Sequence, residues 1–428
     1  MTNYKDYLDA EYRLNEGLIR TDISETRPEG YVKTPLDRMQ TMATFLKQCG
    51  NPQAGIPAIH VAGTSGKGSV CAAIAGALKA AGLKVGLHIS PYLQSATEKI
   101  WIDGKYISAS CFAELIDWIM PIALPFKHSQ TPASIHGMAS VAIAFEAFRR
   151  EKVDMMVFET GCGGRYDLTS FVDTQVAVIT NIGLDHLLSL GPGIEDIAWH
   201  KAGIIRKNIP VITGATGIAL DVIRREAQSL DAPLTCIPPN ASSREHNHQL
   251  ARKAVNEFAG KAGLPLSSLD FEAGLSSVRL PGRFEHISNS PTVFLDGAHN
   301  ADKLTAAIQH ALSNHHMGPR VALVGFLGTK ANHQTIAPIL GKFDHIIATE
   351  PNVYGKAAFP AAETARLFEG ESSAPLVCCD PLQAVQMALE LTQNGTLLIC
   401  GSFYLCGEIR NYWYSKEAVV LQQTSWPD

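Results

Sequence analysis

Short apolar runs alternate along the first half of the chain with segments whose apolar residues recur at helical spacing. The runs are AIHVAG (58–63), KVGLHIS (84–90), VDMMVFET (153–160), QVAVITNI (175–182) and IPVITG (209–214), and the helical segment SVCAAIAGALKAAG (69–82) separates the first two. Each run has the length and the β-branched residues of a strand. The alternation predicts βαβ units, and with them a parallel sheet covered by helices on both faces.

The pattern becomes polar and irregular around residues 238–290, apart from one helical segment at 249–263. A second series of strand-like runs then begins: TVFLDGAHN (292–300), RVALVGFLG (320–328), HIIATEP (345–351), PLVCCD (375–380) and GTLLICGSFYL (395–405), with the helix PLQAVQMALELTQ (381–393) before the last. We therefore predict an α/β protein with a parallel-sheet domain over residues 1–285 and a smaller C-terminal α/β, Rossmann-like domain over residues 286–428.

Composition narrows the class of partner. The chain has 428 residues, of which 46% are hydrophobic and 18% charged, and a formal net charge of −5, so it has no basic field that would hold nucleic acid or an anionic membrane. We expect small-molecule partners, no nucleic acid, no membrane, and a monomer. The nine cysteines lack CxxC pairs, and the N-terminus lacks an apolar signal region. We therefore expect reduced thiols, no zinc, a cytoplasmic location, and no run near the roughly 20 apolar residues of a membrane span.

A glycine-rich loop follows the first strand-like run. In GTSGKGS (63–69) the glycines allow backbone N–H groups to converge on phosphate oxygens, Lys67 adds a cation, and a helix from about Ser69 would present its positive end. The spacing before the lysine is shorter than in the usual GxxxxGK[ST] motif, and a structural glycine turn is the alternative. The order strand, loop, helix favours nucleotide binding, as in a P-loop ATPase-type domain.

Polar residues stand at the ends of other predicted strands. Glu159 directly follows the apolar run MMVF, Asp185 and His186 follow QVAVITNI, and Lys201 lies early in the helix after them. Taken singly, Glu159 could be a capping carboxylate, His186 a hydrogen-bonded structural histidine and Lys201 a solvated helix charge. Because the carboxyl ends of parallel strands share one crevice, their joint placement beside the glycine loop favours a magnesium and phosphate site.

The order of motifs resembles the folylpolyglutamate synthase/dihydrofolate synthase family within the Mur-ligase superfamily. The motifs are HVAGTSGKGSV, ISPYL, ETGCGGRYDLTS, TNIGLDH, IAWHKAGIIR, LPGRFE, FLDGAHN and GSFYLCGEIR, from about residue 35 to 412. The resemblance implies an ATP-dependent, ADP-forming ligase that makes an acyl phosphate from a carboxylate and then an amide with an amino acid, expected to be glutamate.

The resemblance also assigns roles to residues of this chain. Lys67, His186 and Lys201 would be catalytic, and Ser90, Glu159 and His186 would bind Mg²⁺. Lys201 would be carbamylated, which turns a cation into an anion able to hold metal. His299 and Ser402 would hold the amino acid. The residues that would contact ATP are Gly63, Thr64, Ser65, Gly66, Lys67, Gly68, Ser69, Asn247, Arg283 and Asp296.

Departures from the family pattern concern the acceptor acid. The aromatic residue that packs on the pterin is absent from TPASIHGMA (131–139), His200 replaces the glutamate of the family's EKAGI, and the stretch before residue 35 is longer than expected. We expect a pocket beside residues 131–140 that differs from a pterin slot. Tyr92 and His136 could line it, although a buried structural role is open for both.

Two alternatives to a folate ligase follow. The same ligase chemistry could act on a non-pterin carboxylic acid. From another class, the chain could be a P-loop ATP-binding regulatory module without ligation. The motifs DGAHN and GSFYL count against the regulatory module, because a simple nucleotide switch would not need them.

Overall fold

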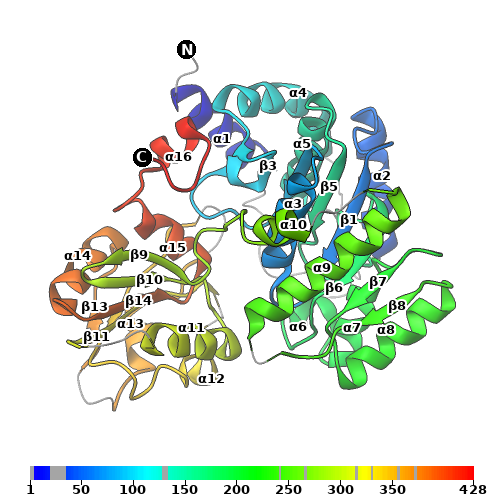
Figure 1. Ribbon diagram of the computed structural model, residues 1–428. Coiled ribbons are helices and arrows are strands. Elements are labelled where there is room, and N and C mark those ends of the chain that lie inside the picture. Colours follow the sequence, from blue (N-terminus) through cyan, green and yellow to red (C-terminus); the bar gives the residue numbers. More distant parts are fainter. Residues whose placement is uncertain are drawn as a thin grey trace. The chain divides into compact units, whose positions relative to one another are not determined.

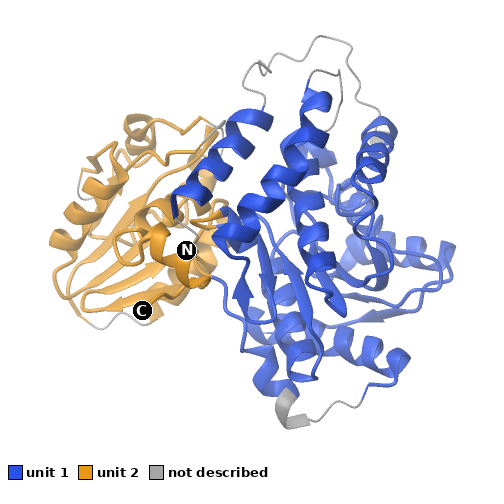
Figure 2. Cartoon of the chain, turned by 90° about the horizontal axis from the view of Figure 1, so that it is seen from above, with its two compact units in different colours: residues 1–92, 96–280 blue, residues 93–95, 281–428 orange. Residues whose placement is uncertain are grey.

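Two sheets organise the chain, one in each of two units. The structure is a computed structural model that describes residues 4–19, 35–127, 134–240, 242–264, 268–313, 317–328, 331–353, 357–370 and 374–428. The first unit comprises Met1–Tyr92 and Ala96–Leu280, and the second comprises Leu93–Ser95 and Pro281–Asp428 (Figure 1, Figure 2). The predicted α/β class is confirmed, with a mainly parallel sheet in each unit.

The sheet of the first unit has eight strands in the order β4-β3-β2-β5-β1-β6-β7-β8. Its strands are β1 (Pro57–Ala62), β2 (Val85–His88), β3 (Ile100–Ile102), β4 (Lys105–Tyr106), β5 (Met155–Glu159), β6 (Asp173–Ile179), β7 (Val211–Thr213) and β8 (Leu234–Cys236). The pairs from β2 to β8 are parallel, and the short strands β3 and β4 add an antiparallel edge. Strand β1 therefore lies inside the sheet, between β5 and β6.

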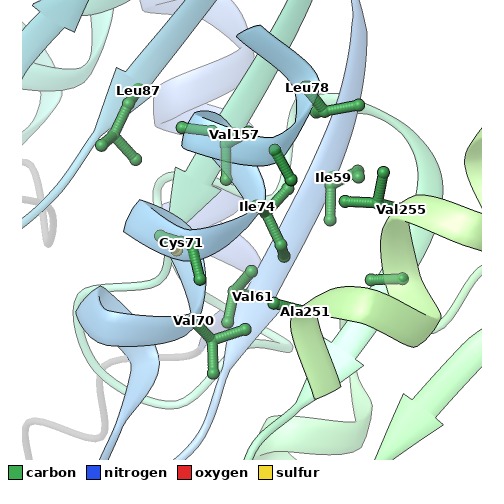
Figure 3. Packing of buried hydrophobic residues seen from close by; sticks show 14 of the residues in the cluster. Ile59, Val61, Val70, Cys71, Ile74, Leu78, Leu87, Val157, Ala251 and Val255 are labelled. Carbon is green, nitrogen blue, oxygen red and sulfur yellow. The ribbon is translucent and has the colours of Figure 1, made fainter. Parts of the chain in front are cut away.

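Helices cover this sheet on both faces. They are α1 (Tyr4–Leu18), α2 (Pro35–Gln48), α3 (Lys67–Ala80), α4 (Ala109–Lys127), α5 (Ile135–Arg150), α6 (Leu187–Leu190), α7 (Ile194–Ala202), α8 (Gly217–Ser229), α9 (Ser243–Ala262) and α10 (Ser268–Leu275), with a 3₁₀ turn at Ala96–Lys99. On one face, Ile74 and Leu78 of α3 pack with Ile59 of β1 and Val255 of α9 (Figure 3). This apolar seam holds α3 against the sheet directly after the glycine loop.

Helix α4 corrects one expectation from the sequence. It is long and apolar enough to cross a membrane by length and composition alone, and the expectation that no such run exists overlooked it. In the structure α4 packs on α1, α2 and α5, and Phe112, Ile116 and Ile119 on its inner side are buried. Core helices pass the same test of length and composition, so this result is weak evidence for a span.

The second unit has six strands in the order β13-β12-β11-β14-β10-β9. The strands are β9 (Glu285–Asn289), β10 (Thr292–Leu295), β11 (Arg320–Val324), β12 (His345–Ala348), β13 (Leu376–Val377) and β14 (Thr396–Cys400). The helices are α11 (Ala301–Ser313), α12 (His333–Ile336), α13 (Ala361–Arg366), α14 (Pro381–Thr392), α15 (Phe403–Arg410) and α16 (Lys416–Gln422). All of these strands pair in parallel except β9, which runs antiparallel to β10.

Polar side chains cap the N-termini of several of these helices. Ser134 accepts a hydrogen bond from the Gly137 N–H at the start of α5, and Ser242 does the same for the Glu245 N–H at the start of α9. Asp380 caps α14 in the same way, with Pro381 in its first turn. These are the polar N-caps that satisfy the free N–H groups of a helix start. They explain why α9 begins at Ser243, ahead of the predicted start at residue 249.

Candidate functional site

The glycine loop follows β1 at the carboxyl edge of the first sheet. Helix α3 begins at Lys67, two residues before the predicted start, and Gly66 precedes it with φ of 79°. A Cβ atom at Gly66 would lie 2.7 Å from Oδ1 of Asn247, so the loop also needs glycine here for space. Asn247, on α9, therefore packs directly against the loop.

The segment after β6 holds the glycine loop in place. Thr180 donates its hydroxyl to the Ser65 carbonyl oxygen (2.6 Å), and the Ser65 N–H donates to Oδ1 of Asn181 (2.8 Å). The Thr64 side chain exchanges hydrogen bonds with the backbone of Gly183, at 3.1 and 3.0 Å. Because β1 and β6 are paired, their two loops form one connected structure at the sheet edge. The loop is thus fixed by its own protein neighbours.

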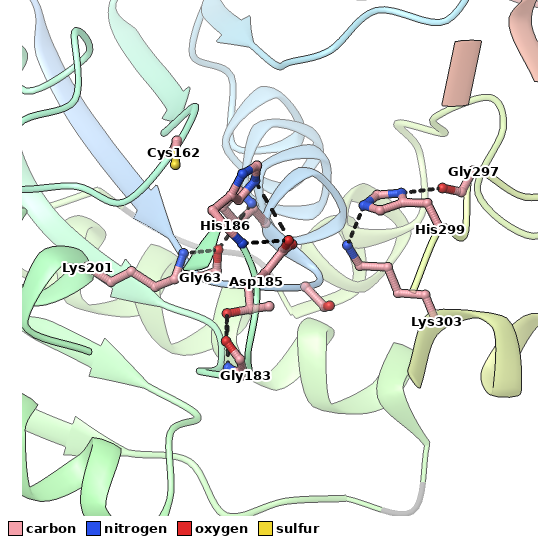
Figure 4. Close-up of polar contacts among 12 residues, drawn as sticks. Gly63, Cys162, Gly183, Asp185, His186, Lys201, Gly297, His299 and Lys303 are labelled. Carbon is pink, nitrogen blue, oxygen red and sulfur yellow. Dashed lines mark hydrogen bonds and ion pairs between the residues drawn. The ribbon is translucent and has the colours of Figure 1, made fainter. Parts of the chain in front are cut away.

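Two lysines meet at one carbonyl oxygen of this loop. Lys201 Nζ donates to the Gly63 oxygen at 2.8 Å (Figure 4). Lys67 Nζ donates to the same oxygen at 3.1 Å. Lys67 Nζ also lies 3.9 Å from Oε1 of Glu159, whose Oε2 accepts the Ser90 N–H at 3.0 Å. The structure therefore brings Lys67, Lys201, Glu159 and Ser90 together around Gly63, at the ends of neighbouring strands.

Lys201 is buried, with 3% of its surface exposed. Burial, together with the positive charge of Lys67, lowers the pKa of Lys201 from 10.5 to about 7. Its place in the chain differs from the prediction, because α7 spans Ile194–Ala202 and puts Lys201 in the last turn of that helix instead of an early one. Near neutral pH a substantial fraction of this amine carries no proton, which is the form that reacts with electrophiles.

His186 lies on the loop that follows β6. Its backbone adopts the left-handed conformation, with φ of 53°, and its N–H donates to Oδ1 of Asp185 at 2.9 Å. Its ring Nε2 lies 4.0 Å from Oδ2 of the same carboxylate. Strain of this kind in a non-glycine residue is typical of functional loops. These contacts join His186 to Asp185, the other polar residue that the sequence analysis placed after this strand.

Within the described residues, no group of three His, Cys, Asp or Glu side chains is arranged to hold a metal ion. Glu159 and Ser90 lie together and offer hard oxygen donors. Mg²⁺ commonly binds through one or two carboxylates, substrate phosphates and several waters, so a sparse protein ligand set fits this ion. A tightly caged ion such as structural zinc would need more protein ligands.

In the second unit, the loop after β10 carries Asp296. Its Oδ2 accepts the Phe284 N–H and its Oδ1 accepts the Ala298 N–H, both at 2.8 Å. Burial raises the pKa of Asp296 from 3.8 to about 6, although both backbone hydrogen bonds oppose this shift. The Arg283 guanidinium lies 5.4 Å from the centre of the Phe403 ring. Arg283 and Asp296 are therefore neighbours at one sheet edge, as expected from their motifs.

His299 and Ser402 follow the paired strands β10 and β14. His299 Nδ1 lies 2.8 Å from the Gly297 oxygen, and its Nε2 lies 3.4 Å from Lys303 Nζ (Figure 4). The Gly401 N–H donates to the Ala298 oxygen at 2.8 Å, which joins the two loops. Ser402 caps α15 by accepting the Tyr404 N–H at 3.2 Å. Lys303, one helical turn after His299, was missed, although its spacing of four residues is a readable signal.

Asp167 is a further residue that sequence reasoning missed. It accepts hydrogen bonds from the Cys162 N–H (2.9 Å), the Thr169 N–H (3.0 Å) and the Thr169 hydroxyl (2.6 Å). These bonds fold the GCGGRYD segment (161–167) back on itself after β5. Asp167 therefore shapes the loop that follows Glu159. The sequence analysis included it only as part of the motif ETGCGGRYDLTS, without a role of its own.

The structure describes only part of the region in which the acceptor pocket is expected. Residues 131–133 and 20–34 lie outside the described residues. Of the rest, Gly137 faces Leu168, whose Cδ1 lies 3.0 Å from the position that a Cβ at Gly137 would take. His200 packs edge-on to the rings of Trp199 and Tyr166, at 5.0 and 5.8 Å. Tyr92 lies 5.3 Å from the Lys99 ammonium.

Comparison with known proteins adds to this geometry. Residues 61–290 match the Mur ligase middle domain, and residues 282–403 match the Mur ligase, glutamate ligase domain. The chain is 32% identical over 419 residues to dihydrofolate synthase/folylpolyglutamate synthase of Bacillus subtilis, covering 89% of this chain and 95% of the relative. The protein of the same name from Escherichia coli is 30% identical over 388 residues, covering 82% and 85%.

Solved structures are similar over nearly the whole chain. Folylpolyglutamate synthase of Mycobacterium tuberculosis complexed with ADP has a TM-score of 0.82 at 25% sequence identity, covering 96% of this chain and 99% of that chain. Folylpolyglutamate synthase of Thermotoga maritima has a TM-score of 0.79 at 24% identity, covering 98% and 99%. At this identity the second likeness concerns the fold alone.

Proposed function

Because the chain belongs to the folylpolyglutamate synthase/dihydrofolate synthase family of Mur ligases, we propose that it is an ATP-dependent ligase that joins glutamate to a carboxylate of dihydropteroate or a folate. ADP and phosphate leave, and an acyl phosphate is the intermediate. The family resemblance predicted from the motifs is confirmed. The observation that carries the proposal is the cluster of Lys67, Glu159 and Lys201 around the glycine loop.

The residues of the first unit fit phosphoryl transfer. Gly63 to Ser69 would surround the phosphates, with Asn247 beside the loop at Gly66. Lys67 would neutralise charge that develops on the transferred group, and its contact with Glu159 keeps its ammonium at the loop. A relative of similar structure is complexed with ADP, which supports ATP as the nucleotide.

Ser90, Glu159 and His186 are our candidates for magnesium ligands. Glu159 is 2% exposed and is already oriented by the Ser90 N–H, so its carboxylate is held at the end of β5. Magnesium bound there would supply charge neutralisation at the phosphate oxygens. His186 would act from the neighbouring loop, where its left-handed backbone fixes its direction.

Lys201 is our candidate for carbamylation. The neutral amine would add carbon dioxide, form an N–C bond and release one proton, which leaves a carboxylate. The lowered pKa of Lys201, about 7, supports this step because it supplies the neutral amine near physiological pH. In the second unit, Arg283 and Asp296 are assigned to the nucleotide, and His299 and Ser402 to the amino acid.

The acceptor has a second candidate, a non-pterin carboxylic acid. It is favoured by the contact of Leu168 with Gly137, which places a bulky side chain beside one residue of the expected pterin pocket. A pterin edge left without hydrogen-bond partners would lose about 1 to 3 kcal/mol per buried polar group. A regulatory module without ligation lacks any such supporting observation.

One experiment decides between the two acids. Each reaction contains the protein, ATP, Mg²⁺, glutamate and one acid, which is dihydropteroate, tetrahydrofolate or a member of a panel of other acids. The mass of the product and the release of ADP are followed in each reaction. A folate product heavier by one glutamyl residue supports the folate assignment. Turnover of another acid with none of any folate refutes it. Lys67→Ala is the control that should remove ADP formation in every case.

We also infer a cytoplasmic protein that works as a monomer. All nine cysteines are free thiols, which fits a reducing compartment. Sedimentation velocity at working concentration tests the monomer, and a dimer would contradict it.

A further inference from the structure

Phe284 is a large aromatic residue with 40% of its surface exposed, directly after Arg283. Its backbone is left-handed, with φ of 48°. A bulky side chain in this region is a conformational outlier, since clashes with the neighbouring backbone disfavour it. Outliers of this kind persist where the surrounding structure holds them, and they gather at ligand sites.

Two sets of hydrogen bonds hold the Phe284 backbone. Its N–H donates to Oδ2 of Asp296 at 2.8 Å, while Oδ1 of Asp296 is held by the Ala298 N–H. The Gly297 N–H donates to the Gly282 oxygen at 3.0 Å, which ties the turn before Phe284 to the same loop. The turn PGRF (281–284) is therefore fastened to the loop that follows β10.

The ring of Phe284 is supported from behind. Its centre lies 5.1 Å from the ring of His310 on α11, and His310 in turn lies 5.6 Å from Phe294 of β10. His286 also stacks on Phe294, at 5.0 Å with an interplanar angle of 29°. This row of rings fixes the position of the exposed member, Phe284, before any ligand arrives.

We propose that the ring of Phe284 is the surface on which the adenine base of ATP stacks. The inference rests on the proposed function, which assigns Arg283 and Asp296 to the nucleotide. Phe284 is covalently next to Arg283 and hydrogen-bonded to Asp296, so a nucleotide that contacts both has its base within reach of this ring. A rigid, exposed aromatic face offers stacking to a purine.

The test uses the full chain and measures binding, so that it does not depend on ligation. ATP and inorganic tripolyphosphate are titrated calorimetrically into the wild type, Phe284→Asn, Phe284→Leu and Phe284→Trp. Asparagine favours the left-handed backbone, so Phe284→Asn keeps the turn and removes the ring. Phe284→Leu keeps apolar volume without a π face. Leu382→Ala, an exposed apolar residue of α14, is the control.

Stacking predicts that Phe284→Asn and Phe284→Leu bind ATP about 10- to 100-fold more weakly, with unchanged tripolyphosphate affinity and an undiminished melting temperature. Phe284→Trp and Leu382→Ala should bind ATP like the wild type. Wild-type ATP affinity in Phe284→Asn overturns the inference. So does an equal loss for ATP and tripolyphosphate, because the effect then arises from the phosphate contacts. Failure of ligation with intact ATP binding would count against the proposed function only.

Discussion

The Gly63 carbonyl oxygen accepts hydrogen bonds from two lysine ammonium groups, and the Glu159 carboxylate lies 3.9 Å from one of them. Two cations sharing one acceptor repel each other in a buried setting, where water screens them little. Deprotonation of Lys201, its conversion to an anion, or the arrival of phosphates each relieves this repulsion. Negative charge added beside the glycine loop would therefore be stabilised by these two lysines.

Lys67 should be required for chemistry and dispensable for folding. Lys67→Ala removes the cation at the loop but little packing, so we expect a loss of about a hundredfold or more in the rate of ADP formation, with a nearly unchanged melting temperature. Lys79→Ala, in the last turn of the same helix, is the matched control and should keep its activity. Retention of most activity by Lys67→Ala would remove the lysine from the phosphate site.

Lys201 should carry a carbamate when bicarbonate is high. Because the pKa of Lys201 is lowered to about 7, the neutral amine becomes dominant as pH rises above that value. Native mass spectrometry should therefore show one added carbon dioxide, with greater occupancy at pH 8 than at pH 6, and Lys201→Arg should lack it. An unmodified lysine at pH 8 in high bicarbonate, together with full activity of Lys201→Ala, would contradict the assignment.

At the scale of elements, α3 crosses α10 at a pair of glycines. A Cβ at Gly76 would lie 2.1 Å from the Gly274 oxygen and 2.6 Å from the Ser277 hydroxyl. The crossing therefore depends on the absence of side chains there. Helix α3 begins directly after the glycine loop, so this crossing also steadies the loop.

Gly76→Ala should lower the free energy of unfolding by about 1 to 2 kcal/mol, because overpacking against backbone outweighs the gain in helix propensity. Gly260→Ala is the matched control on α9, since a Cβ added at Gly260 would meet no atom within 4 Å. There the same change should stabilise by about 0.5 to 1 kcal/mol. Urea unfolding measures both, and the same sign for both variants would contradict the crossing.

The parallel strands were predictable because short, continuous apolar runs between turn signals are typical of buried strands. The hairpin of β3 and β4 was missed, although Asp103 and Gly104 form the Asp-Gly pair that is typical of a tight hairpin turn. Both residues have the positive φ that such a turn requires. The segment Leu93–Ser95 had no local signal at all. It belongs to the second unit because Leu93 packs in that unit's core and Gln94 accepts a hydrogen bond from buried Arg410, and such long-range contacts leave no pattern in a short window.

In the candidate site, too, the features with a local sequence signal were predictable and those that depend on long-range contacts were not. Strand ends placed Glu159 and the glycine loop correctly, since parallel strands bring their carboxyl ends to one edge. What the sequence did not reveal was the set of supporting contacts. The tie from Asn181 to Ser65, the carboxylate of Asp167 and the ring row behind Phe284 depend on side-chain directions fixed by packing.

For the whole molecule, the chain passes between the units at three places: Tyr92 to Leu93, Ser95 to Ala96, and Leu280 to Pro281. Leu93, at the first of these, lies only three residues after Ser90, whose N–H is bonded to Glu159. Three residues span at most about 10 Å. The backbone that carries Ser90 in the first unit therefore enters the second unit within three residues.

Acid should destabilise the protein through two buried histidines. His60 and His88 flank Phe158 in the registered strands β1, β5 and β2, and burial lowers the pKa of each from 6.5 to about 3. Between these values the unfolded chain binds protons that the folded chain excludes, so stability falls as pH falls from 6.5 toward 3. Each histidine contributes up to about 1.4 kcal/mol per pH unit to this slope. Asp296 acts in the opposite sense, because its folded pKa is raised to about 6.

The difference between a variant and the wild type isolates one histidine from these opposing groups. His88 stacks on Phe158 at 4.6 Å, so His88→Phe keeps an aromatic contact and removes the titrating ring. Urea unfolding at pH values from 6.5 to 4 should show the variant gaining about 1.4 kcal/mol relative to the wild type for each unit that pH falls. A difference that stays constant with pH would mean that His88 takes up its proton equally well in the folded and unfolded chain, and the burial argument would fail for this residue.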